Sequence, residues 1–120
     1  MINATTAFMR RITSIFVLFQ IPIAAICQQW EIISPANNCT NRHENALAAV
    51  KGKLLLLGGR GTKPVESFEP KTKKWTRLTE SPIEMHHFQA VTYNSEVWVL
   101  GAFTGGYPHE TPIPNIYIFN

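Results

Sequence analysis

The chain has 120 residues with a formal net charge of +3, and 45% of its residues are apolar. A chain of this length ordinarily forms one modest domain. Arg10 and Arg11 belong to a leading segment, and the 93 residues after position 27 carry nine Lys and Arg against eight Glu, a net charge of about +1. Nucleic-acid binding is therefore not expected, because it needs a concentrated positive surface.

The first 27 residues are predicted to be a signal peptide. The arginine pair precedes an apolar run over residues 12–27, which polar residues interrupt. A transmembrane helix needs roughly 18 or more apolar residues, so the run fits a secretory signal better. Ala25 and Cys27 supply the small residues for cleavage after position 27. We expect a secreted or periplasmic protein that meets a membrane only through this segment.

Residues 28–41 are predicted to hold one strand and a linker. From Trp30 onward the chain shows short apolar runs divided by turn residues and no helical periodicity, which is typical of all-β proteins. The stretch WEIIS at Trp30–Ser34 fits the outer strand of a preceding sheet. Cys39 is the only cysteine after the cleavage point, which indicates either a disulfide partner elsewhere or a buried free thiol.

Two segments repeat one another at a shift of 43 residues. The stretch HENALAAVKGKLLLLGG at 43–59 aligns without a gap with HHFQAVTYNSEVWVLGA at 86–102. Residues 51–52 and 94–95 fall on the same two-residue position between apolar runs, where a hairpin turn needs a positive φ. Each copy is therefore expected to be a β-hairpin, with a buried strand at 53–57.

Two more strands are predicted after the first hairpin. VESFEPKTKKW at 65–75 indicates a strand, a turn and a second strand that opens on Trp75. NIYIFN at 115–120 repeats only the start of this pattern. Residues 42–82 therefore form one complete four-stranded repeat and residues 83–120 an incomplete one, a period that indicates propeller blades.

Three features of the first repeat occur in a fixed order. They are the pair Gly58-Gly59, the aromatic residues Phe68 and Trp75 with six residues between them, and the stretch LTESPIEM that follows. In this order they resemble a kelch repeat. The second copy departs from the pattern at Ala102, which replaces the second glycine. The resemblance implies an all-β fold, a partial kelch-type β-propeller of about two blades of four-stranded antiparallel sheet.

A propeller needs more repeats than this chain supplies. Propellers usually close with about 4–8 blades, and repeat proteins usually need three or more repeats to bury a core. We therefore expect the chain to be an N-terminal fragment that requires further blades of the same longer protein.

The kelch resemblance also implies which end of the blades binds ligand. In kelch propellers the residues that lead into the innermost strand, and the loop after the second strand, face the side that commonly binds ligand. The loop at 103–115 is about eight residues longer than its counterpart, and long loops on a rigid scaffold often carry function. The candidate ligand-binding residues at these positions are Arg42, His43, Glu44, His86, His87, Tyr107, His109 and Glu110.

Several side chains at these positions could be metal ligands, but a metal site is not predicted. Glu44, His86, His87, His109 and Glu110 are suitable ligand types for zinc or copper. However, neighbouring residues on a strand point to opposite faces, so His86 and His87 are not expected to hold one ion together. The sequence lacks the set of tyrosine, cysteine and histidine residues that a copper centre of the galactose oxidase kind needs. No metal and no cofactor are predicted.

Two interpretations of Glu44 remain open at this point. Glu44 and His87 occupy the same position in adjacent repeats, so the two side chains would form an acid/base pair if they line one cleft. Alternatively, Glu44 would form a surface ion pair with Arg42.

Ligand binding without catalysis requires less exact placement of these residues than metal binding or acid/base catalysis does. Their charged donors, acceptors and one aromatic ring suit hydroxyl-rich glycans or peptide backbone. The sequence predicts an exported kelch-repeat segment that acts as a binding module for a protein or glycan partner, rather than an enzyme. The alternative is the N-terminal part of a kelch-fold carbohydrate-active enzyme, a sugar epimerase, a mutarotase or a galactose oxidase-like oxidase. A purely architectural repeat is the third possibility.

Overall fold

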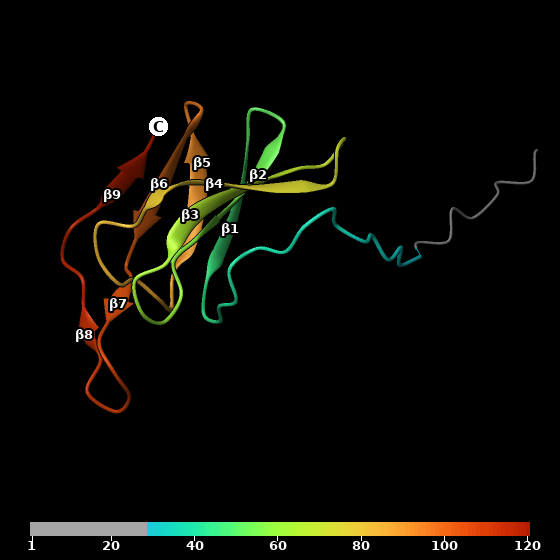
Figure 1. The fold of residues 1–120 in the computed structure, drawn as a ribbon. Coiled ribbons are helices and arrows are strands. Elements are labelled where there is room, and N and C mark those ends of the chain that lie inside the picture. Colours follow the sequence, from blue (N-terminus) through green and yellow to red (C-terminus); the bar gives the residue numbers. More distant parts are fainter. Residues whose placement is uncertain (1–28) are drawn as a thin grey trace, which may run out of the picture. The chain divides into compact units, whose positions relative to one another are not determined.

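The structure is a computed structural model that describes residues 29–120. The predicted signal peptide and its cleavage point lie outside the described residues. Residues 32–120 form one compact unit, in which all regular structure is β-strand (Figure 1). Within residues 29–120, no helix is long and apolar enough to cross a membrane. The prediction of an all-β fold is confirmed.

The first sheet contains the complete repeat. Its strands β1 (Ala46–Val50), β2 (Lys53–Leu57), β3 (Pro64–Glu69) and β4 (Lys74–Glu80) lie in sequence order, each antiparallel to the next. Phe68 lies opposite Trp75, and the centroids of the two rings are 5.0 Å apart. The two aromatic residues therefore lie opposite each other on neighbouring strands.

The second sheet is incomplete, also as predicted. It contains β5 (Gln89–Tyr93), β6 (Glu96–Leu100) and β9 (Tyr117–Phe119), again in sequence order and antiparallel. The long loop between β6 and β9 forms a small hairpin of its own from β7 (Phe103–Thr104) and β8 (Thr111–Pro112). The four-stranded and three-stranded sheets match the partial propeller expected from the sequence.

The backbone repeats with the same shift as the sequence. Ala46 lies opposite Leu57 in the first hairpin, and Gln89 lies opposite Leu100 in the second, so each partner is displaced by 43 residues. This identical register follows from the two-residue turns at 51–52 and 94–95, because turn type and loop length fix the register of a hairpin.

The two hairpin turns also have the same geometry. The φ angles of Lys51 and Gly52 are 49° and 77°, and those of Asn94 and Ser95 are 48° and 64°. Positive φ at both central residues is what a two-residue turn between right-twisted strands requires. The predicted turn positions are therefore confirmed.

The strand predicted at Trp30–Ser34 is not formed, since residues 29–41 contain no strand. Instead, the linker hydrogen-bonds to β4 and to the turn before it. The side-chain amide of Asn37 donates to the Trp75 carbonyl at 3.1 Å and accepts from the Trp75 amide at 2.9 Å, and the Ala36 amide donates to the Lys73 carbonyl at 2.8 Å. One side-chain amide thus satisfies backbone groups on the outer strand that a strand partner would otherwise satisfy.

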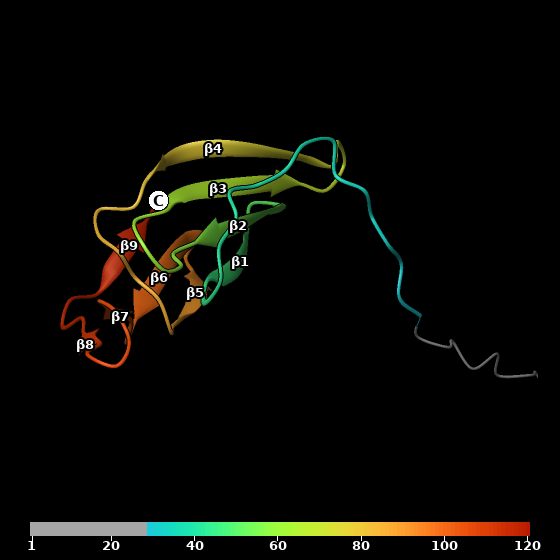
Figure 2. The ribbon, with the colours of Figure 1, turned by 60° about the horizontal axis from the view of Figure 1, so that its bottom comes forward.

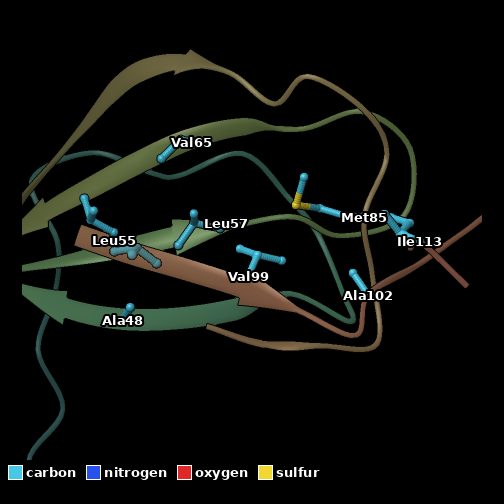
Figure 3. Close-up of a cluster of buried hydrophobic side chains, with 9 residues drawn as sticks. Ala48, Leu55, Leu57, Val65, Met85, Val99, Ala102 and Ile113 are labelled. Atoms are coloured by element: carbon cyan, nitrogen blue, oxygen red, sulfur yellow. The ribbon is translucent and has the colours of Figure 1, made fainter. Parts of the chain in front are cut away.

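The core lies between the two sheets (Figure 3). Strands of the first sheet, strands of the second and the connecting segments all contribute buried side chains to it; these are Ala48, Leu55, Leu57, Val65, Met85, Val97, Val99, Ala102 and Ile113. β1 and β5 lie side by side (Figure 2), and the Thr92 hydroxyl donates to the Ala49 carbonyl at 2.7 Å. Because these two strands run next to each other, the segments that lead into them meet at one end of the molecule.

Candidate functional site

Glu44 and His87 occupy equivalent positions just ahead of β1 and β5. Their φ angles are 57° and 53°, in the left-handed region that few non-glycine residues adopt. His86 is still extended, because its amide and carbonyl both hydrogen-bond to Phe103 at 2.9 Å in an isolated bridge. The chain therefore changes direction between His86 and His87.

This change of direction brings the two imidazoles together. Their ring centroids are 5.0 Å apart and the rings meet edge to face. Glu44 Oε2 lies 3.8 Å from His86 Nδ1 and 3.4 Å from His87 Nε2. The prediction that the neighbouring histidines diverge is wrong, because it assumed an extended strand and His87 has a left-handed backbone instead.

His86 is the most enclosed member of the site, with a side chain that is 0% exposed. Its Nε2 lies 3.0 Å from the Gly105 carbonyl oxygen. A carbonyl only accepts, so Nε2 carries the hydrogen, and in the neutral ring Nδ1 then holds a lone pair. Among residues 29–120, that buried Nδ1 atom has no hydrogen-bond partner.

Arg60, a residue that the sequence analysis missed, connects the site. It follows Gly58 and Gly59 in the loop between β2 and β3. Its Nε lies 2.6 Å from Glu44 Oε2. Its Nη2 lies 3.2 Å from His87 Nε2 and also pairs with Glu110. Its Nη1 donates to the Gly105 carbonyl at 3.3 Å. The signal for Arg60 was its place directly after the glycine pair, in the loop that the kelch resemblance assigns to the ligand face.

The charges at this site stabilise one another. The carboxylate of Glu110 raises the pKa of Arg60, and the guanidinium of Arg60 holds the pKa of Glu110 below its ordinary value. Glu110 Oε1 also lies 3.4 Å from His87 Nε2. Two carboxylates therefore lie around one guanidinium and one imidazole, and all four groups can take part in hydrogen bonds.

Four of the eight predicted residues converge here, namely Glu44, His86, His87 and Glu110. His43 lies at the border, with an exposed ring whose Nδ1 is 3.6 Å from Glu44 Oε1. Tyr107 and His109 are exposed on the hairpin formed by β7 and β8. The structure thus brings together residues from three separate segments of the chain.

Arg42 does not join these residues. Its side chain is 2% exposed and pairs with Glu66, which is also buried. The same guanidinium donates to the carbonyls of Gly58 at 3.0 Å and Pro64 at 2.8 Å. The alternative of an ion pair between Arg42 and Glu44 is wrong, because each side chain has a different partner.

Glu84 holds the two loops beside the site. Its carboxylate accepts from the Gly61 amide at 2.6 Å and from the Gly105 amide at 3.2 Å. These contacts, the Gly61 amide first, lower the pKa of Glu84 from its ordinary value of 4.5. No sequence signal pointed to Glu84, because its partners are backbone groups of distant loops.

We expect Glu84→Gln to lower the free energy of unfolding at pH 7 by about 1 kcal/mol, the typical net value of such a bond at a partly exposed position. The folded-state pKa is the lower one, so this contribution is present above pH 4.5 and is lost as the pH falls through the lowered value. Urea unfolding at several pH values measures both. A difference between wild type and variant that persists unchanged in strong acid would contradict the assignment.

Comparison with known proteins gives no relative for this chain: no family model matches it, and neither does any curated protein.

Proposed function

We propose that this chain is an exported binding module whose polar site, defined as Glu44, Arg60, His87 and Glu110, binds a hydroxyl-rich glycan. The convergence of these four side chains is the observation that carries the proposal. Their exposed fractions range from 22% to 43%, so a ligand can reach each of them. A sugar hydroxyl both donates and accepts, which suits a site where carboxylates, a guanidinium and an imidazole lie within a few ångströms.

Export and kelch-family membership are part of this proposal. The leader at residues 1–27 supports export. The shift of 43 residues, which recurs in sequence, strand register and turn geometry, supports consecutive kelch repeats. The long hairpin of residues 103–112 supports a binding role, since its Glu110 and Gly105 form one wall of the polar site. A protein partner is the other ligand class, and further blades of a longer chain would enlarge the site.

The runner-up is a carbohydrate-active enzyme of the kelch fold. One observation favours it: Glu44 Oε2 lies 3.4 Å from His87 Nε2, as an acid/base pair would require. Two observations weigh against it. Arg42, one of the candidate ligand-binding residues, pairs with Glu66 away from this site. The guanidinium of Arg60 pairs with both carboxylates, Glu44 and Glu110, that would have to exchange protons.

A glycan array probed with the folded protein tests the proposal. We expect retention on one class of glycan, and the variant Glu110→Gln should bind that class at least about tenfold more weakly, because a charged hydrogen-bond partner is replaced by a neutral one. Glu80→Gln is the matched control. Glu80 pairs with Arg77 at an exposed position on β4, so its loss should leave glycan binding unchanged.

The thermal unfolding transition shows whether each protein is folded before the array is read. Failure of folded wild type to bind any glycan would overturn the proposal, and so would equal weakening by Glu110→Gln and Glu80→Gln. Retention on a peptide array alone would assign the site to a protein partner instead.

A further inference from the structure

Three side chains of this region form a compact set of metal-ligand atoms. One donor atom from each of Glu44, His86 and His87 lies within 4.8 Å of the other two. Glu44 Oε2 is 3.8 Å from His86 Nδ1 and 3.4 Å from His87 Nε2. Zinc bonds to nitrogen and oxygen of 2.0–2.1 Å, at tetrahedral angles, place neighbouring donor atoms roughly 3.3 Å apart. The two distances from Glu44 Oε2 are close to that spacing, and the two histidine nitrogens lie within 4.8 Å of each other.

His86 supplies a second and independent observation. Its ring is fully buried, and its Nδ1 has no hydrogen-bond partner in the part of the chain that the structure describes. This atom lies 3.8 Å from the Glu44 carboxylate. A buried acceptor without a partner is costly, so native proteins rarely leave one in place without a reason. The other ring nitrogen donates to the Gly105 carbonyl at 3.0 Å. Histidine ligands of metals are usually held in this way, with the second ring N–H bonded to a carbonyl or a carboxylate.

We propose that Glu44, His86 and His87 bind a Zn²⁺ ion in exchange for the side chain of Arg60. Two imidazoles and one carboxylate form a donor set that zinc accepts with a fourth position left open. Phe103 lies beside His87, with ring centroids 6.4 Å apart and the rings edge to face. This proposal does not depend on the glycan proposal, because metal binding can be measured without any sugar.

Arg60 is the competitor in this exchange. Its Nε lies 2.6 Å from the Glu44 oxygen that faces both histidines, and one of its amino groups lies 3.2 Å from His87 Nε2. A guanidinium and a zinc ion carry charge of the same sign and need the same donor atoms, so they do not occupy the site together. The Arg60 side chain is 23% exposed and also pairs with Glu110. It can therefore move toward solvent and keep Glu110 as a partner when it leaves Glu44.

Titration calorimetry of the full chain with ZnCl₂, after treatment with a chelator, tests the exchange. We expect one zinc ion per chain for the variant Arg60→Ala, with an affinity at least about tenfold higher than that of wild type, because the competing cation is gone. Co²⁺ in place of Zn²⁺ should give the strong visible absorption of a tetrahedral site. Mg²⁺ should not bind, because it prefers six oxygen ligands.

Ligand variants are made in the Arg60→Ala background. Removal of His86 endangers folding, so His87→Ala and Glu44→Gln are used, since both side chains are partly exposed. Each should weaken zinc binding at least about tenfold without a large change in the thermal transition. His109→Ala is the matched control, an exposed histidine outside the cluster, and should bind as before. The proposal is overturned if Arg60→Ala binds no zinc, binds it more weakly than wild type, or loses as much affinity through His109→Ala as through His87→Ala.

Discussion

Replacement of Arg42 by methionine is expected to lower the free energy of unfolding by about 3–5 kcal/mol, the range measured when one partner of a buried ion pair is removed. Arg42 and Glu66 are 2% and 7% exposed. Without the guanidinium, the Glu66 carboxylate keeps only the amide and hydroxyl of Thr40, each 3.1 Å away. The carbonyls of Gly58 and Pro64 lose a donor as well. Urea unfolding of wild type and variant gives the difference directly.

Arg77→Met provides the matched control. Arg77 pairs with Glu80 on β4, but the two side chains are 61% and 56% exposed. Exposed pairs contribute about 0–1 kcal/mol, so this variant should stay close to wild type. The double variant Arg42→Met/Glu66→Met should regain part of the loss, because it leaves no buried charge without a partner. Equal effects of Arg42→Met and Arg77→Met would show that burial of the pair does not determine its contribution.

Arg42 also shows what the sequence could not predict about the site. Arg42, His43 and Glu44 are consecutive and were assigned together to the ligand face. In the structure Arg42 pairs instead with Glu66, which lies 24 residues away in β3. A pair between the segment before β1 and a residue of β3 leaves no local pattern in the sequence, because the position of one residue does not indicate the other.

The fold was predictable because its determinants are local. The apolar runs of β1, β2, β5 and β6 marked these segments as strands, and the turn residues at 51–52 and 94–95 set the register of both hairpins. The strand expected at Trp30–Ser34 is the exception. That strand was predicted to join a preceding blade, and neither sheet of the two repeats is that blade. The linker that follows it hydrogen-bonds to Trp75 in β4 through the side chain of Asn37.

The geometry of the histidines depended on distant contacts. His86 is held by backbone hydrogen bonds to Phe103 and by the Gly105 carbonyl, both in the loop whose length was noticed but whose path was not predictable. The pattern of residues 83–91 indicated a lead-in to a strand and gave the correct repeat position. It did not show that His87 turns away from the extended path, and this turn is what makes a shared ligand cluster possible.

Replacement of Gly58 by alanine is the second large effect that we expect, a loss of about 2–5 kcal/mol in the free energy of unfolding. Gly58 has a φ of +67°, where an L-residue costs about 1–2 kcal/mol. A Cβ at this position would also lie 2.5 Å from the Met85 carbonyl oxygen and 2.5 Å from a ring carbon of Phe88. Relief of such a contact requires the backbone of residues 85–88 to move, and overpacking of this kind costs about 1–3 kcal/mol more.

Gly101 is the control that the repeat itself provides. It occupies the equivalent position 43 residues later with the same φ of +67°, but a Cβ there would meet nothing within 4 Å. Gly101→Ala should therefore cost only the backbone term of about 1–2 kcal/mol. Thermal and urea unfolding of both variants separates backbone strain from steric conflict. Both sites have the same backbone strain, but only the Gly58 site has a steric conflict. If the two variants lose the same stability, the close approach of residues 85–88 to Gly58 does not contribute to the free energy of unfolding. The position of His86 in the ligand cluster would then not depend on this contact.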